Sequence, residues 1–215
     1  MADPRPYSAE DFRRRVAARL EHNGEAVGDH VFNPELADVL LAMERRAAAV
    51  LVPVIHREPE ATVLFTERTG GLRAHAGQIS FPGGRVDPED SGPEAAALRE
   101  AGEEIGLLPE FVETVGRAPD YLTGSGYHVA VVVALVRPGF ELAINPAEVA
   151  DVFEVPLSFL MDPANHRQGS RLWHGAQRSF FEMPFENRNI WGITAGIVRI
   201  LYERLYREPT KGVAI

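Results

Sequence analysis

The distribution of apolar and polar residues along the chain predicts strands and helices that follow one another over most of its length. Apolar runs rich in β-branched residues are typical of strands, and they occur at 48–55, 61–67, 78–81, 127–137 and 152–155. The polar turn at 57–60 separates the first two runs and predicts a hairpin. The run at 78–81 leads directly into a pair of glycines.

Helical spacing of apolar residues marks the remaining segments. We expect helices at about 9–21, 33–46, 92–105 and 189–207, with a loop at 24–32. Ser8 is expected to cap the first helix, and the Ser91-x-x-Glu94 pattern resembles a capping box for the third. Gly106 is placed to end that third helix in the left-handed conformation.

This order of elements predicts an α/β (α+β) fold with a mixed β-sheet sandwiched between α-helices. The length of 215 residues fits one domain. We divide it into an N-terminal helical extension over 1–47, packed on the core, and the main domain over 48–215. Phe12, Val16 and Leu20 form an apolar stripe on the first helix, which suggests a homodimer.

Composition narrows the function classes. The chain contains no cysteine, which excludes disulfides and thiolate metal sites. A net charge of −9 opposes binding to DNA or RNA, because phosphate backbones require a basic surface. We find no apolar run long enough for a membrane span and no signal-peptide pattern, so we expect no membrane partner and a cytoplasmic location.

The strongest chemical signal is a set of acidic residues in the third predicted helix. Glu100, Glu103 and Glu104 are spaced so that a helix places them on one face, where like charges repel. A solvated helix surface is the ordinary explanation for such a face. A divalent cation would offset the repulsion, and carboxylate oxygens suit Mg²⁺ or Mn²⁺.

The surrounding residues resemble the Nudix box, the signature of enzymes that hydrolyse a nucleoside diphosphate linked to another moiety. Residues 99–107 match the pattern Arg-Glu-apolar-x-Glu-Glu-x-Gly-apolar at every fixed position. The first half of the box departs from the pattern. Asp90 replaces the usual Glu, and eight residues rather than seven separate it from Arg99.

A second motif directly precedes the box. Residues 64–84 resemble the additional motif of the coenzyme A pyrophosphatase branch of the Nudix family, which includes a Leu-Arg-x-His-x-Gly-Gln segment and a Phe-Pro-Gly-Gly end. The resemblance extends more weakly to 145–149, 153–157 and 191–195 and implies a Nudix fold over most of the chain.

The resemblance also implies roles for individual residues. The resemblance implies that the metal ligands are Glu100, Glu103 and Glu104. It implies that the catalytic residues are Glu103, Glu148 and Arg99. For substrate binding it gives Arg68, Arg73, His75, Gln78, Gly83 and Gly84. Arg99 is expected to hold the glutamates in place, and His75 has a structural role as its alternative. Glu103 and Glu148 both remain candidates for the general base, with Glu154 as a weaker one.

The expected activity is therefore metal-dependent hydrolysis of the pyrophosphate bond of coenzyme A or acyl-CoA. The products would be 3′-phospho-AMP and (acyl-)4′-phosphopantetheine, and the cofactor Mg²⁺ or Mn²⁺. Two alternatives stay open. The chain could be a Nudix pyrophosphatase of ADP-ribose or another nucleoside diphosphate derivative, or a non-catalytic nucleotide-binding module that kept the fold.

Overall fold

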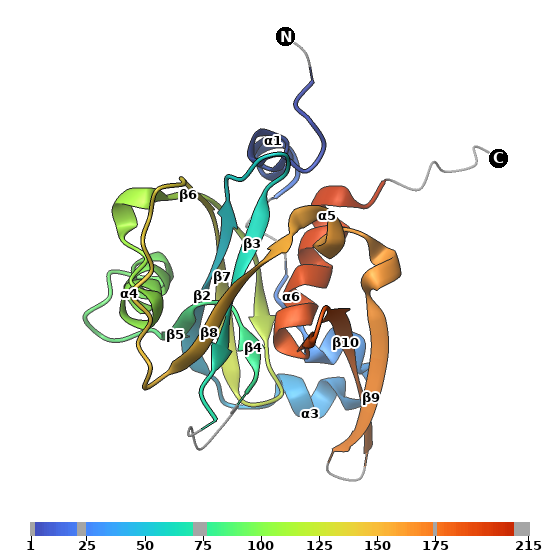
Figure 1. The fold of residues 1–215 in the computed structure, drawn as a ribbon. Helices are drawn as coiled ribbons and strands as arrows, with labels where there is room; N and C mark the ends of the chain where they lie inside the picture. The colour runs from blue at the N-terminus through green and yellow to red at the C-terminus, as the bar shows by residue number, and fades with distance from the viewer. Residues whose placement is uncertain (1–2, 21–24, 71–76, 174–175, 209–215) are drawn as a thin grey trace, which may run out of the picture.

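The larger of two β-sheets forms the centre of the molecule (Figure 1). The structure is a computed structural model that describes residues 3–20, 25–70, 77–173 and 176–208. Within these ranges the larger sheet has eight strands, with β1, β6, β7, β2, β3 and β4 side by side in that order, while β5 pairs with β2 and β8 pairs with β3. The strands are β1 Val27–Gly28, β2 Arg46–Ile55, β3 Thr62–Arg68, β4 Ile79–Ser80, β5 Gly83–Arg85, β6 Val112–Leu122, β7 Tyr127–Val136 and β8 Val149–Pro156.

Parallel and antiparallel pairs coexist in this sheet. Strands β2 and β7 are parallel over ten residue pairs, from Arg46 opposite Tyr127 to Ile55 opposite Val136. Strands β1 and β6 are also parallel, and the remaining pairs are antiparallel. The mixed sheet expected from the sequence is thus confirmed. The hairpin between β2 and β3 is present as well.

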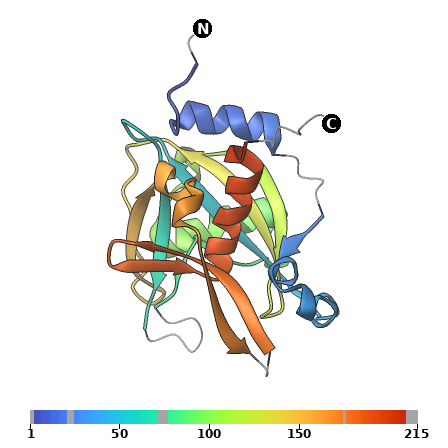
Figure 2. The same cartoon turned by 90° about the vertical axis from the view of Figure 1, so that its right-hand side faces the viewer.

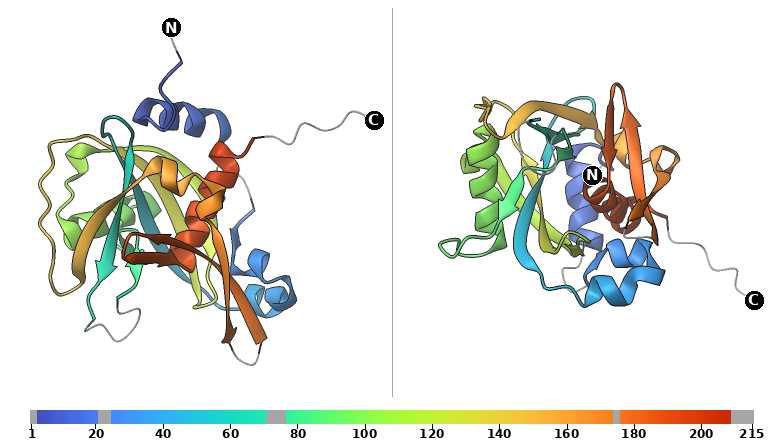
Figure 3. Two further views of the ribbon diagram at one scale, coloured as in Figure 1. Left: turned by 45° about the vertical axis from the view of Figure 1, so that its right-hand side comes forward. Right: turned by 90° about the horizontal axis from the view of Figure 1, so that it is seen from below.

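Each face of the sheet is covered by its own layer of helices. On β2, Ala49 and Leu51 belong to the core beneath helix α4 (Pro93–Ile105), whereas Ala48 and Val52 belong to the core on the opposite face. That second core contains α1 (Ala9–Arg19) and α6 (Ile193–Leu201). Figure 3 shows α4 and α6 on opposite sides of the sheet. Burial on both faces explains why β2 and β7 are almost continuously apolar.

A second sheet, with three antiparallel strands, follows the larger one in sequence. It consists of β9 (Arg167–Trp173), β10 (Ala176–Phe185) and β11 (Arg188–Trp191), with β10 in the middle. Phe181 and Met183 on β10 are buried in the core that contains α6. The alternate residues of β10 therefore face the other side of this sheet. The short helices α5 (Leu157–Leu160) and η3 (Pro163–Asn165) connect the two sheets.

The N-terminal segment packs on the same core as α6. Helix α1 begins after Ser8, whose hydroxyl accepts a hydrogen bond from the Asp11 N–H at 3.2 Å, as expected. Phe12 and Val16 are buried in the core of their own chain, and Figure 2 shows α1 lying across the C-terminal end of α6. The apolar stripe therefore gives no support to a homodimer. A division at residue 47 stays a prediction.

Two N-terminal predictions were wrong. The expected loop at 24–32 contains β1 and the short helix α2 (Asp29–Phe32), because pairing with β6 orders this segment. The expected helix at 33–46 consists of η1 (Pro34–Leu36) and α3 (Ala37–Leu41) and ends well before β2. The Asn33 side chain does not cap η1, because its Nδ2 atom donates to the backbone carbonyl oxygens of Asp29 and Ser179 and its Oδ1 atom accepts from the Ser179 N–H.

Two details further along the chain, the cap of α4 and the start of α6, also differ from expectation. The N-cap of α4 is Gly92, without a side-chain cap, so the predicted capping box of Ser91 and Glu94 is wrong. Gly106 does end α4 with φ of 69°. The expected helix at 189–207 begins only at Ile193, because the preceding residues form β11, and it ends in the π-helical turn η4 (Tyr202–Tyr206).

One remaining short element, η2 (Pro109–Phe111), joins α4 to β6. No helix in the described ranges combines the length and apolarity that crossing a membrane requires.

Candidate active site

The site is built around the two glycines of β5. Gly84 lies opposite Ala49 and Gly83 lies opposite Val50 in the pairing of β5 with β2. A Cβ atom on Gly83 would overlap the carbonyl oxygen of Ala49, so a side chain would prevent this close approach of the two strands. The glycines of this strand therefore bring a backbone N–H group next to α4.

Two glutamates of α4 lie directly against these glycines. The Gly83 N–H donates a hydrogen bond to Glu104 Oε2 at 3.2 Å. The carboxyl group of Glu100 lies so close to Gly84 that a Cβ there would overlap it. The side chain of Glu104 is only 3% exposed and that of Glu100 is 16% exposed. The absence of side chains on β5 therefore creates the space that these two carboxylates occupy.

Burial changes the proton affinity of both groups. The pKa of Glu104 is raised to about 7, mainly by burial and also by the charges of Glu100 and Glu148, while the Gly83 N–H and Arg68 act in the opposite direction. Burial likewise raises the pKa of Glu100, against the effect of Arg99. Three carboxylates are thus close enough to repel one another in a poorly solvated place.

Arg99 organises the exposed side of the same helix. Its Nε and Nη2 atoms donate to the two carboxylate oxygens of Asp90, each at 3.0 Å. Its Nη1 atom donates to Glu100 Oε1 and Glu103 Oε2, each at 3.1 Å. The Arg99 guanidinium holds the pKa of Asp90 below its usual value. Arg99 thereby connects the loop before α4 to two glutamates of the helix.

Glu103 and Glu148 approach the site from different elements. Glu103 is 59% exposed and contacts Arg99. Glu148 lies in the loop before β8, where its Oε1 atom accepts a hydrogen bond from Asn145 Nδ2 at 3.4 Å. That loop is fixed on one side by the Asn145 N–H, which bonds to the carbonyl oxygen of Glu104 at 2.9 Å. It is fixed on the other by Thr69, whose N–H bonds to the carbonyl oxygen of Glu148 at 3.0 Å.

A cavity of about 730 Å³ opens beside the glycine strand. Gly83, Gly84, Arg68 and Gln78 form part of its lining. Arg68 also lies 3.6 Å from Glu104, measured from Nη1 to Oε1. This volume is in the range of pockets that bind small molecules. The cavity therefore places a prospective ligand next to the strand that supports both buried glutamates.

The sequence of this chain is similar to that of known hydrolases. Residues 45–174 match the family model described as NUDIX domain. A Photorhabdus laumondii protein named as an uncharacterized Nudix hydrolase NudL is 39% identical over 165 residues, which are 77% of this chain and 88% of that protein. A Yersinia pestis protein of the same name is 39% identical over 160 residues, or 74% and 80% of the two chains.

The chain belongs to the Nudix family. It is a hydrolase of the pyrophosphohydrolase type, and α4 with its preceding loop is its Nudix box. Solved structures with partial likeness include a C. elegans Ap4A hydrolase binary complex (TM-score 0.44, 19% identity, 52% of this chain and 80% of that chain). The NUDIX domain of Shewanella oneidensis NrtR complexed with ADP ribose is another (TM-score 0.42, 20% identity, 59% and 84%).

The structure brings most of the expected Nudix site residues together. Those that share one neighbourhood, through the contacts given above, are Arg68, Gly83, Gly84, Arg99, Glu100, Glu103, Glu104 and Glu148. Gln78 lines the adjoining cavity. Arg73 and His75 lie outside the described residues. Glu154 bonds to Arg57 and Thr62, which accounts for its carboxylate without a catalytic role.

The carboxylates suit a divalent cation without forming a complete cage. In the described part of the chain, no three His, Asp or Glu side chains are arranged to hold a metal ion. Glu100 and Glu104 are nevertheless buried, mutually repelling oxygen donors, and Arg99 is already engaged by Asp90. Mg²⁺ commonly takes one or two protein carboxylates and completes its shell with water and phosphate oxygens.

Sequence reasoning missed several residues that shape this Nudix site. Asp90, which holds Arg99, is one of them, and a carboxylate at the position of the usual Glu was the available signal. Asp29, Arg46, Arg171, Arg178 and Trp191 all line the cavity, yet they come from segments remote in sequence from the box. Trp191 belongs to a segment that resembles the coenzyme A branch, but no sequence pattern indicated that these five residues share a wall.

Proposed function

We propose that this Nudix hydrolase cleaves the pyrophosphate bond of coenzyme A or acyl-CoA. The observation that carries the proposal is the placement of Glu100 and Glu104 against Gly83 and Gly84, beside a large cavity rich in arginine. The resemblance of residues 64–84 to the coenzyme A branch supports this substrate class. The products would be 3′-phospho-AMP and (acyl-)4′-phosphopantetheine, and the cytoplasmic location stays a prediction.

Glu100 and Glu104 would hold the metal ion, with Glu103 as a further ligand. When bound, Mg²⁺ or Mn²⁺ would neutralise charge on the diphosphate and lower the pKa of a bound water molecule. The donor set supports this assignment because the charges of Glu100 and Glu148 raise the pKa of Glu104. A cation between these groups would remove that unfavourable interaction.

The other residues would position the glutamates and the substrate, or deprotonate the attacking water. Arg99 holds Glu100 and Glu103 in place through its hydrogen bonds to both. Arg68, beside Glu104, would contact a diphosphate oxygen, for which a guanidinium is well suited. A carboxylate outside the tightest metal coordination would accept the proton of the attacking water, and Glu103 and Glu148 both remain candidates.

Hydrolysis of a panel of substrates tests the proposal. Purified protein is incubated with CoA, acyl-CoA, ADP-ribose and NADH, with Mg²⁺ or Mn²⁺, and the products are separated by chromatography. We expect the highest kcat/KM on CoA or acyl-CoA, and complete loss of turnover in EDTA. Preference for ADP-ribose or NADH would favour the alternative enzyme, and no turnover of any substrate would favour a non-catalytic binding module.

Three Glu-to-Gln variants separate the two candidate bases. Glu94→Gln is a matched control, because Glu94 lies on the same helix and is exposed. The variant that removes the base should lose turnover and the acidic limb of its pH–rate profile. If Glu103→Gln and Glu148→Gln both behave as Glu94→Gln does, neither residue is the base.

A further inference from the structure

Two arginines face each other across neighbouring strands of the three-stranded sheet. Arg171 on β9 lies directly opposite Arg178 on β10 in the strand register. Like charges at such a position destabilise a sheet. Both residues line the 730 Å³ cavity. They belong to the three-stranded sheet, whereas the glycine strand belongs to the larger sheet.

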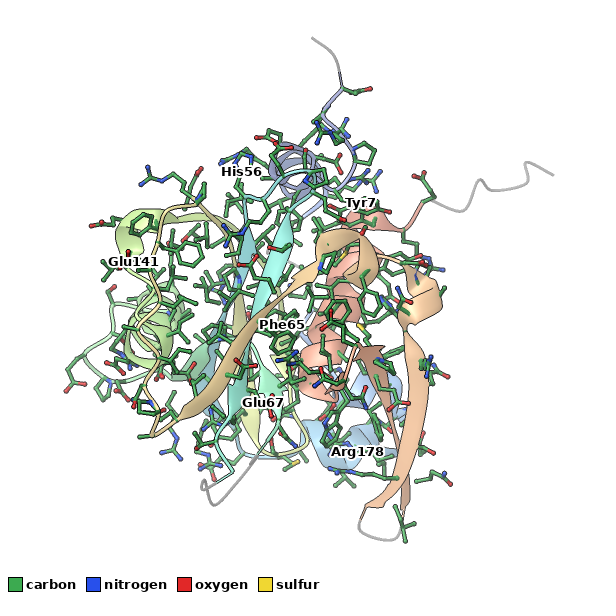
Figure 4. The ribbon with its side chains drawn as sticks, viewed as in Figure 1. Tyr7, His56, Phe65, Glu67, Glu141 and Arg178 are labelled. Carbon is green, nitrogen blue, oxygen red and sulfur yellow. The ribbon has the colours of Figure 1, made fainter. Side chains whose placement is uncertain are left out.

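The position of Arg178 is fixed by a buried carboxylate. Asp29, which is 5% exposed, forms an ion pair with Arg178. The same carboxylate accepts hydrogen bonds from the Tyr121 hydroxyl at 3.0 Å and from the Gly124 N–H at 2.5 Å. Figure 4 shows Arg178 beside the N-terminal helical segment that contributes Asp29. The guanidinium is therefore presented to the cavity by a rigid support.

The cavity as a whole is positively charged, in a protein with a net charge of −9. Its described lining contains one carboxylate, Asp29, and five arginines: Arg46, Arg68, Arg85, Arg171 and Arg178. Arg171 is exposed and makes no ion pair with a carboxylate among the described residues. Arg68 lies beside Glu104 and Arg85 belongs to the glycine strand, whereas Arg46, Arg171 and Arg178 come from other strands that line the cavity.

Aromatic rings accompany these arginines. The Arg171 guanidinium lies 5.2 Å from the ring centre of Trp191, and Arg46 lies 4.5 Å from that of Tyr127. Both rings line the cavity. Phe180 packs edge-on against Trp191, with ring centres 5.6 Å apart, and so restricts its movement. Guanidinium groups next to flat rings provide contacts for a phosphate and for a nucleobase.

We propose that this surface, formed by Arg46, Tyr127, Arg171, Arg178 and Trp191 and here called the distal wall, binds a phosphate monoester on the nucleotide part of the substrate. The base of the nucleotide stacks on Trp191, and the phosphate contacts Arg171 and Arg178. This assignment rests on the proposed function, since it takes the diphosphate to lie at the Gly83–Gly84 end. In CoA this phosphate monoester is the 3′-phosphate, which the three-stranded sheet would therefore recognise.

Binding of reaction products tests the distal wall without requiring hydrolysis. The dissociation constants of 3′-phospho-AMP and AMP are measured in EDTA by calorimetry and by quenching of tryptophan fluorescence. A charge-assisted phosphate contact predicts tighter binding of 3′-phospho-AMP by at least about tenfold. Arg171→Gln should abolish this preference and leave the affinity for AMP nearly unchanged. Arg46→Gln provides a second exposed variant with the same expected direction.

Arg167→Gln is the matched control. Arg167 is exposed on the same face of β9 but does not line the cavity. Equal affinity of the wild-type protein for both products would overturn the proposal, and so would equal losses in Arg171→Gln and Arg167→Gln. If the protein hydrolyses CoA but binds 3′-phospho-AMP no more tightly than AMP, the proposal for the distal wall is overturned and the proposed function stands. A clear preference in a protein that does not hydrolyse CoA would overturn the proposed function alone.

Discussion

Arg99 and Asp90 form a two-point ion pair, in which two guanidinium nitrogens each lie 3.0 Å from a different carboxylate oxygen. Asp90 is itself fixed by the N–H of Asp87, at 2.8 Å. The pair joins the long loop of the Nudix box to the helix, so Asp90 serves as the anchor of Arg99 although it is shorter than the usual Glu.

Asp90→Asn should therefore weaken the site without unfolding the protein. Residues that orient metal ligands typically change activity or metal affinity by about 10- to 100-fold, and we expect a loss of kcat and of apparent Mg²⁺ affinity in that range. Steady-state kinetics over a Mg²⁺ titration measure both. Asp87→Asn is the control, since Asp87 is 55% exposed and 3.7 Å from Arg99. Similar kinetics for both variants would show that Asp90 does not position Arg99.

Glu104→Gln should separate catalysis from stability. The variant keeps the size of the side chain and removes its charge, and kcat should fall by at least about 100-fold, the scale of losing a strong electrostatic contact. The metal-free protein should become no less stable, because the charged form of Glu104 is disfavoured by burial. Near-normal kcat would remove Glu104 from the metal site.

The same variant gives a pH-dependent difference in stability. The ordinary pKa of 4.5 rises to about 7 in the folded protein, so the stability associated with Glu104 is complete below pH 4.5 and is lost as pH rises through 7. In EDTA, the wild-type protein should lose about 3 kcal/mol relative to Glu104→Gln across this window. Thermal unfolding of both proteins over the window measures the difference. Parallel curves would show that the pKa of Glu104 is not raised.

Gly84→Ala should displace Glu100. A Cβ atom at this position would overlap the Glu100 carboxyl group, and a small misplacement of a catalytic group can cost about 100-fold in rate. Gly70→Ala is the control, since a Cβ atom there would have no neighbour within 4 Å. Kinetics and thermal unfolding of both variants are compared. Full activity of Gly84→Ala would mean that Glu100 is free to move without loss.

His166, which lies outside the box, should give the protein a second pH dependence of stability. This side chain is buried, and its Nε2 atom bonds to the carbonyl oxygen of Leu160 at 2.8 Å. Burial lowers its pKa from the ordinary value of 6.5, and the charge of Arg199 lowers it further. The associated stability is therefore present above pH 6.5 and is lost as pH falls below it. His166→Gln should flatten this part of the stability curve, and an unchanged slope would contradict the assignment.

The parts of the fold that could be predicted from the sequence are those whose burial repeats with a regular period. Strands β2 and β7 are apolar on both faces, and α4 has a clear end at Gly106. The three-stranded sheet was missed because β9 mixes charged, polar and glycine residues, while Ile190 of β11 falls into helical register with Ile193 and Ile197 by coincidence.

The site residues also fall into a group that the sequence could predict and a group that it could not. The glutamates of the box lie on one helix, so their spacing was sufficient to place them together. Asp29, Arg178 and Trp191 meet only through tertiary packing, and local sequence carries no information about that meeting. Arg178 on β10 can be recognised as part of the site only when its ion-pair partner on α2, Asp29, is known.

The hydrogen bonds between Asn33 and Ser179 have a consequence for how selectivity is encoded. The Asn33 side chain bonds to both the N–H and the C=O of Ser179, next to Arg178. Both residues lie outside the family match at 45–174, on opposite sides of it. The support of Arg178 thus depends on segments that flank the family match on both sides, so exchanging these flanks between relatives should loosen the proposed distal wall while leaving the glutamates of the box in place.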